Sequence, residues 1–99
     1  MFFINVMNSY REVVAICDSD LIGKVFESGK FQLNVKESFY KGKQVSEKEL
    51  LNKIYHLSGE DATFNIVGKN SINVALKAGI ILEEGIKEIE GIPYALVLL

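Results

Sequence analysis

The start of the chain shows two patterns of apolar residues that are typical of β-strands. Along residues 2–7 a fully apolar set (Phe2, Ile4, Val6) alternates with a set that is only partly apolar (Phe3, Asn5, Met7), and residues 13–17 form a continuous apolar run rich in β-branched residues. Alternation predicts a strand with two different faces, whereas a continuous run predicts a strand covered on both faces. Because residues 8–11 are turn-like, we expect these two strands to form a central hairpin.

Three segments carry the signals of helices. Residues 18–20 offer N-cap candidates ahead of apolar residues spaced along one helix side, which predicts a short helix ending near residues 28–29. Ser46 and Glu49 match a capping box, so a second helix begins there and ends at residues 58–59, with Ile54 and Tyr55 in its buried stripe. A third helix is predicted over residues 71–78.

The remaining apolar segments predict further short strands. Residues 31–35 alternate, residues 63–67 are a further strand candidate, and the apolar pieces at 80–82, 86–89 and 94–99 are consistent with two more strands. Residues 38–43 are expected to form an exposed loop. The sequence thus predicts one small α+β domain over residues 1–99, mixed α/β in character, with about five or six short strands and two to three helices packed on the sheet.

Composition and cysteine use narrow the class of protein. Apolar residues make up 48% of the chain and charged residues 24%, which is typical of a globular domain. The single cysteine, Cys17, lies in an apolar run, so we expect a buried thiol in a reducing compartment. The start lacks a signal-peptide pattern, and no apolar run approaches the ~20 residues of a membrane helix, so we expect a cytoplasmic protein that contacts no membrane.

The charges are unevenly distributed. The net charge of −2 argues against binding to nucleic acid through a broadly basic surface. Residues 24–53 nevertheless hold seven lysines against four glutamates, a balance of +3, whereas residues 83–90 hold four glutamates against one lysine, a balance of −3. Ordinary solvated faces explain both segments, and a polarised binding surface is the functional alternative.

Few residues are suited to catalysis or metal binding. The single histidine, His56, is predicted on the solvent face of a helix, so a relay with a nucleophile is not expected, and Cys17 and His56 are too few ligands for structural zinc. Asp18, Asp20 and Asp61 could gather around magnesium, but helix caps and turns explain them at least as well. We therefore expect no catalytic residues, no metal site and no cofactor.

One candidate binding feature is the junction at Gly68, between a predicted strand and a predicted helix. Free backbone N–H groups at a helix N-terminus can bind an anion, and Asn65 and Lys69 flank this turn. The glycine pattern of phosphate-binding loops is missing. A tight strand-to-helix connection is the alternative.

A second candidate feature is an aromatic pair among lysines. Phe39 and Tyr40 lie between Lys36 on one side and Lys41 and Lys43 on the other. Single-stranded RNA binding uses this combination for base stacking and phosphate contact. Alternatively, Phe39 fills the core.

Four blocks stand out along the chain: AICDSDLIGKVF, ESFYKGKQVSEKEL, FNIVGKNSINVALKAGII and IEGIPYA. In this order they resemble the blocks of an archaeal family known as domain of unknown function 424. The resemblance extends over residues 14–95 and implies an archaeal source, a small mixed α/β fold and an association with the translation apparatus. The family's Gly-x-Pro-His pattern here ends in Tyr94, which argues against acid–base chemistry at that position.

These features lead to three hypotheses. The first is a non-enzymatic module that binds RNA or a ribosomal subunit, and its expected contacts are Lys24, Lys36, Tyr40, Lys41, Lys43, Asn65, Gly68 and Lys69. The second is a protein–protein adaptor or homodimer that pairs its apolar strand 94–99 at an open sheet edge. The third is a small-molecule or anion-binding enzyme acting through Asp18, Lys24 and Asn65, which requires a closed pocket joining those three residues.

Overall fold

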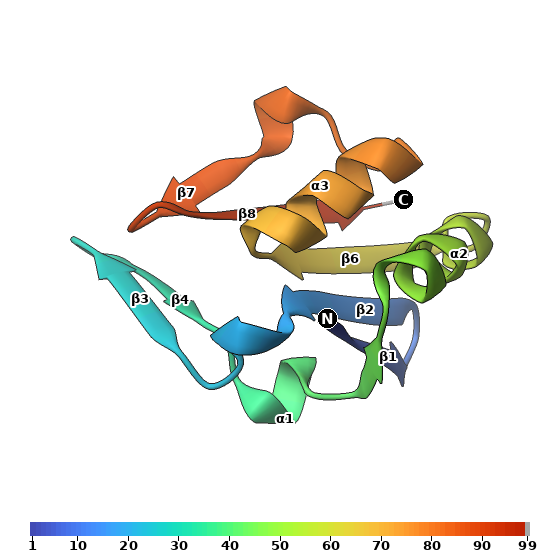
Figure 1. Ribbon diagram of the computed structural model, residues 1–99, viewed down its shortest axis with the longest axis horizontal. Helices are drawn as coiled ribbons and strands as arrows, with labels where there is room; N and C mark the ends of the chain where they lie inside the picture. The colour runs from blue at the N-terminus through green and yellow to red at the C-terminus, as the bar shows by residue number, and fades with distance from the viewer. Residues whose placement is uncertain (99) are drawn as a thin grey trace.

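A computed structural model, which describes residues 1–98, shows a mixed sheet of six strands with helices on one face (Figure 1). The strand order is β5-β1-β2-β6-β8-β7. The six strands are β1 (Phe2–Asn8), β2 (Glu12–Asp18), β5 (Lys43–Val45), β6 (Ala62–Val67), β7 (Lys87–Ile89) and β8 (Ile92–Leu98). The described chain also contains a separate hairpin of β3 (Val25–Ser28) and β4 (Phe31–Asn34), and the helices α1 (Glu37–Tyr40), α2 (Glu47–Leu57) and α3 (Lys69–Ala78).

The predicted hairpin of the first two strands is confirmed. β1 and β2 pair antiparallel along their whole length, from Phe2 opposite Asp18 to Asn8 opposite Glu12. β2 then pairs in parallel with β6, which pairs antiparallel with β8. Residues 14–18 of β2 are all buried, because this strand has neighbours on both sides and is covered on both faces.

The two faces of the sheet are covered differently. α2 and α3 lie on one face, where Leu50, Ile54 and Ile72 pack against Ile16 and Phe64 of the strands. We call this the helix-covered face. On the opposite side, the second face, the covering elements are α1 and the β3–β4 hairpin. In Figure 1 α1 lies below the sheet, and in both figures the hairpin projects to the left of it. The small α+β domain expected from the sequence is therefore confirmed.

The capping box at the start of α2 is also confirmed. The Glu49 backbone N–H donates to Ser46 Oγ at 3.2 Å, and the Ser46 N–H donates to Glu49 Oε1 at 3.0 Å. The bond from the Ser46 N–H favours the ionised carboxylate and holds the pKa of Glu49 below its ordinary value. No helix of residues 1–98 is long and apolar enough to cross a membrane.

The expected helix over residues 21–28 is wrong. Only a short 3₁₀ turn forms, at Ser19–Leu21, and the chain then continues as β3. The β-branched and aromatic residues Val25 and Phe26 pair across to Asn34 and Leu33 of β4, and Gly29, with a φ of +61°, turns the hairpin instead of ending a helix. Local apolar spacing indicated a helix because it could not detect the partner strand.

Other differences are smaller. The expected loop at residues 38–43 overlaps α1 and contains the first residue of β5. Because β3 and β5 were not predicted, the described chain has eight strands instead of five or six. Tyr55, expected in the buried stripe of α2, is 54% exposed because Ile54 takes the inward position. The predicted last strand matches β8, and Leu99 lies outside the described residues.

Replacement of Ser46 by alanine tests the capping box. We expect Ser46→Ala to lower the free energy of unfolding by about 1 kcal/mol at neutral pH, because the Glu49 N–H loses its acceptor, Ser46 Oγ. The folded-state pKa of Glu49 is depressed, so its contribution is present above the ordinary value of 4.5 and is lost as pH falls through the lower folded value. The difference in free energy of unfolding between the wild type and Ser46→Ala, measured by urea denaturation, should therefore be smaller at acidic pH. Ser38→Ala, at an exposed position of α1, is the control and should change stability little.

Candidate functional site

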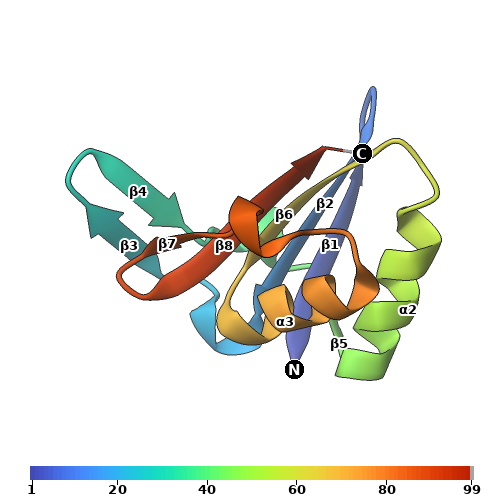
Figure 2. The ribbon, with the colours of Figure 1, turned by 90° about the horizontal axis from the view of Figure 1, so that it is seen from above.

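The second face of the sheet is only partly covered. Phe26 and Leu33 of the β3–β4 hairpin pack toward the sheet, and the hairpin also contacts β7. Farther along β8, Leu96 is 62% exposed and Leu98 is 71% exposed. Figure 2 shows the reason: the hairpin projects from one end of the strands and leaves the other end uncovered.

Two adjoining cavities lie between the hairpin and the second face, and we call them together the hairpin cleft. Each has a volume of about 250 Å³, and Tyr94 of β8 lines both. The first cavity is lined mainly by Leu33, Tyr40, Asn65, Tyr94 and Leu96, and the second by Ser28, Phe31, Lys87, Glu88, Ile89 and Tyr94. The cleft thus combines apolar and aromatic side chains with polar and charged groups, which are most numerous in the second cavity.

Two of these polar groups are free to bind a ligand. Within residues 1–98 the side-chain amide of Asn65 makes no hydrogen bond, and neither does the hydroxyl of Tyr40. Burial, with a smaller effect from neighbouring Cys17, raises the pKa of Tyr40 to about 12, so its hydroxyl stays protonated at physiological pH. An amide that donates and accepts, together with a neutral hydroxyl, can orient a ligand inside an apolar cleft.

Four lysines that the sequence proposed as contacts gather around α1. Lys36 precedes the first residue of α1 and Lys41 follows its last, Lys43 begins β5, and the carbonyl of Lys24 accepts from the N–H of Val35 at 2.9 Å. All four, which we call the α1 lysines, are exposed. Only Lys41 among them forms an ion pair in the described chain, at 3.6 Å from Glu37.

Tyr40 does not have the position that base stacking would need. Its side chain is 7% exposed and belongs to the core cluster on the second face. Phe39 packs edge-on against it, with the ring centroids 5.0 Å apart and the planes at 76°. Tyr40 therefore lines the cleft at one side, and its ring is not open to an incoming base.

The helix N-terminus at Gly68 is already occupied. Both oxygens of the buried Asp18 carboxylate point into the first turn of α3, where Oδ1 accepts from the Ser71 N–H at 2.8 Å and from Ser71 Oγ at 2.6 Å. Oδ2 accepts from the backbone and side chain of Asn70 at 3.2 and 3.3 Å. The anion expected at this turn is thus the chain's own carboxylate, and Lys69 lies exposed beside it.

Gly68 is required by the same contact. Its φ is +112°, and an added Cβ would lie 2.5 Å from the Asp18 carboxyl carbon. Asn65, Asp18 and Lys24 do not share the first cavity of the cleft, because only Asn65 lines it. The condition for an enzyme acting through these three residues is therefore not met there.

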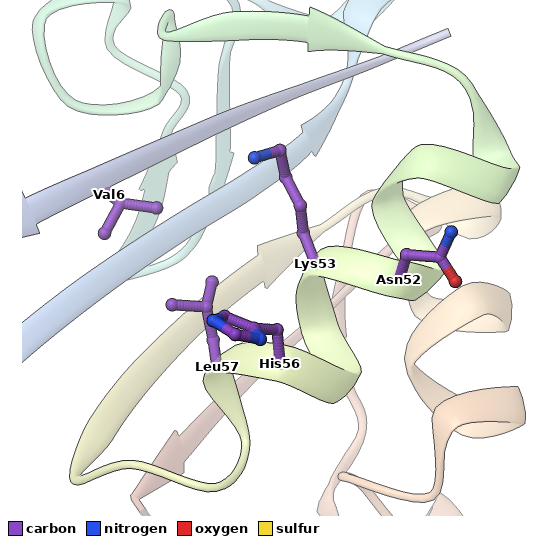
Figure 3. Close-up of a pocket in the computed structure, with 5 residues that line it drawn as sticks. All are labelled: Val6, Asn52, Lys53, His56 and Leu57. Carbon is purple, nitrogen blue, oxygen red and sulfur yellow. The ribbon is translucent and has the colours of Figure 1, made fainter.

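Another cavity, of about 350 Å³, lies between α2 and β1 (Figure 3). Val6 faces Leu57 and His56 across it, Lys53 extends beside them, and Asn52 points away. His56 is exposed, as expected from its position on the helix. The lining offers an imidazole and an ammonium group but no hydroxyl, thiol or carboxylate side chain to act with them.

Sequence reasoning missed part of the cleft. Phe31, Leu33 and Lys87 were not proposed as contacts, and Tyr94 was considered only as a departure from a family pattern and as the first residue of the apolar strand 94–99. Phe31 lines the same cavity as Tyr94 because the hairpin folds back toward β7, a contact between distant segments of the chain. The one local signal was the exposed pair Lys30 and Phe31 next to Gly29, a basic and an aromatic residue at a turn.

Removal of the Asp18 carboxylate tests its structural role. We expect Asp18→Ala to lower the free energy of unfolding by about 2–3 kcal/mol, because the buried N–H and hydroxyl of Ser71 lose their partner. Chemical denaturation followed by circular dichroism measures the difference. Asp20→Ala, at an exposed carboxylate, is the control with a change of less than ~0.5 kcal/mol. Equal effects of the two substitutions would contradict the role of Asp18 as the cap of α3.

Comparisons with known proteins agree with this fold. No curated protein matches the chain. A solved structure described as an uncharacterized conserved protein from Methanopyrus kandleri is similar, with a TM-score of 0.85, 26% sequence identity, and coverage of 98% of this chain and 91% of that chain. This similarity to an archaeal protein supports the archaeal origin that the resemblance implied. The profile of one family matches residues 7–99, so the chain belongs to the family described as protein of unknown function (DUF424).

Proposed function

We propose that this domain is a non-enzymatic module that binds single-stranded RNA, with a base in the hairpin cleft and the phosphates on the α1 lysines. The observation that carries the proposal is the position of Tyr94 in both cavities of the cleft, opposite the 71% exposed ring of Phe31. Open sheet faces with aromatic side chains are a common platform for unpaired bases.

The cleft has the chemistry that an unpaired base requires. Aromatic rings provide stacking surfaces for any base, and the uncommitted amide of Asn65 can donate to and accept from a base edge.

The α1 lysines supply the second element of the proposal. They are exposed, and Lys24, Lys36 and Lys43 form no ion pair within residues 1–98, so their charges are available to phosphates. Lys24 and Lys36 flank the hairpin at its base, next to the strands β3 and β4 whose side chains form one wall of the cleft. Lys69 is the first residue of α3, apart from the α1 lysines, and would make a separate contact with a phosphate.

Association with a ribosomal subunit is the biological setting that we propose for this activity. It rests on the association with the translation apparatus that the family resemblance implies, and it would require the domain to be cytoplasmic. The cleft would then hold an exposed nucleotide of a folded ribosomal RNA, because sequence-specific recognition of RNA favours loops and bulges whose bases are unstacked.

Charge reversal at the base of the hairpin tests the phosphate contacts. We expect Lys24→Glu with Lys36→Glu to weaken binding of a single-stranded RNA oligonucleotide at least about tenfold, and to reduce the slope of log K against log salt by about 0.7 per lost contact. Lys48→Glu with Lys53→Glu on α2 makes the same change in net charge and is the matched control. Equal losses in both proteins, measured by fluorescence anisotropy, would mean that only net charge matters and that the α1 lysines are not the site.

Removal of an aromatic ring tests the cleft itself. We expect Phe31→Ala to weaken binding of the same oligonucleotide about tenfold, because a stacked base contributes roughly 1–3 kcal/mol. The fold should survive, since the ring is 71% exposed. Tyr10→Ala removes a 98% exposed ring from the β1–β2 turn and should leave the affinity unchanged. If both proteins bind like the wild type, the base is not held in the hairpin cleft.

A further inference from the structure

β8 extends beyond its outer neighbour. On its inner side it pairs with β6 from Tyr94 to Leu98, whereas on its outer side β7 pairs only with residues 92–94. The outer side of residues 95–98 is therefore an open sheet edge. The second hypothesis drawn from the sequence, strand pairing at the C-terminal strand, depends on such an edge.

The direction of each backbone group follows from one hydrogen bond. The N–H of Gly68 donates to the carbonyl of Pro93 at 2.9 Å, which makes this a hydrogen-bonded pair of the β6–β8 ladder. Because backbone groups alternate along antiparallel strands, those of Ala95 and Val97 also point toward β6. The N–H and C=O groups of Leu96 and Leu98 point outward, and within residues 1–98 they have no partner.

A groove runs beside this edge on the helix-covered face. It has a volume of about 440 Å³, and residues 80–85 form one wall while residues 95–98 form the other. The groove is mostly apolar, with Ile80, Ile81 and Leu82 on the first wall, and Leu82 is 70% exposed. A strand added to the edge of β8 would place alternate side chains in this groove.

The rim of the groove is acidic. Glu84 lines it, Glu83 is its neighbour, and both carboxylates are exposed without an ion pair in the described chain. They begin the acidic segment 83–90, which has a balance of −3. Charge complementarity therefore favours an occupant with Lys or Arg next to its apolar residues.

We propose that the open edge of β8 binds an extended segment of another protein, apolar at alternate positions and flanked by basic residues, which adds to the sheet as a further strand. Main-chain hydrogen bonds to Leu96 and Leu98 supply affinity, while the groove and the glutamates select the side chains. Natural sheet edges are commonly protected by lysine, proline or a bulge, and residues 95–98 contain neither lysine nor proline.

The groove argues against a second copy of the chain as the occupant. Two β8 strands could pair about a two-fold axis at Val97, with Leu96 of each opposite Leu98 of the other. That arrangement would place only the small side chains of Val97 and Ala95 on the groove side, and a volume of about 440 Å³ would stay largely unfilled. It would also bring no basic side chain, because residues 92–98 contain none.

The test uses the full chain and a fluorescent probe peptide of alternating valine and threonine with an arginine at each end. We expect the wild-type protein to bind it measurably and a probe with glutamate at each end to bind at least about tenfold more weakly. Leu98→Pro removes an outward N–H and should weaken binding about tenfold, whereas Leu98→Ala keeps this group and should bind within about threefold of the wild type. Both variants should fold, since the Leu98 side chain is 71% exposed and its N–H is unpaired.

A second variant keeps the test decisive if Leu98→Pro unfolds. Glu83→Lys with Glu84→Lys changes two exposed side chains and should reverse the preference between the two probes. Absence of binding by the wild type, or equal binding by Leu98→Pro and Leu98→Ala, would overturn the proposal. A dimer in analytical ultracentrifugation that Leu98→Pro dissociates would also overturn it, because the occupant would then be a second copy. RNA affinity should be the same in wild type and Leu98→Pro, so failure here is distinct from failure of the RNA proposal.

Discussion

The arrangement of the domain depends on one buried carboxylate. Asp18 ends β2, the strand with neighbours on both sides, and accepts four hydrogen bonds from Asn70 and Ser71 in the first turn of α3. A carboxylate tolerates burial only when such bonds compensate the loss of water. The end of β2 and the start of α3 must therefore stay in contact, and Gly68 leaves the space that this contact needs.

The position of Asp18 at the end of β2 also determines how the second face is covered. After Asp18 the chain leaves the sheet and returns only at β5, so residues 19–42 must form the whole cover with a hairpin and the short helix α1. The hairpin forms a two-stranded sheet of its own and packs on the second face through Phe26 and Leu33. Part of the second face consequently stays open, and the hairpin cleft forms where the cover ends.

Much of the fold could be predicted where the determining contacts are local. The capping box of Ser46 and Glu49, the continuous apolar run of β2 and the glycine after α3 each act within a few residues. The hairpin of β3 and β4 could not be recognised, because Val25 and Phe26 suit a helix face and a strand equally well until Leu33 and Asn34 pair with them. The hairpin cleft could not be predicted for the same reason, since Phe31 and Tyr94 are distant in sequence and line one cavity only in the folded chain.

The uneven charges explain how a chain with a net charge of −2 can have the two different binding surfaces that we propose. The α1 lysines lie at the base of the hairpin, whereas Glu83 and Glu84 border the outer edge of β8. Ionic interactions at an exposed surface are screened over about 8 Å at physiological salt, so each surface is governed by its local charges and not by the total. β8 can contribute both to the hairpin cleft and to the open edge, because a strand presents its side chains to the faces of the sheet and its backbone groups to the edge. The side chains of Tyr94 and Leu96 thus line the cleft, while the backbone groups of Leu96 and Leu98 form the open edge.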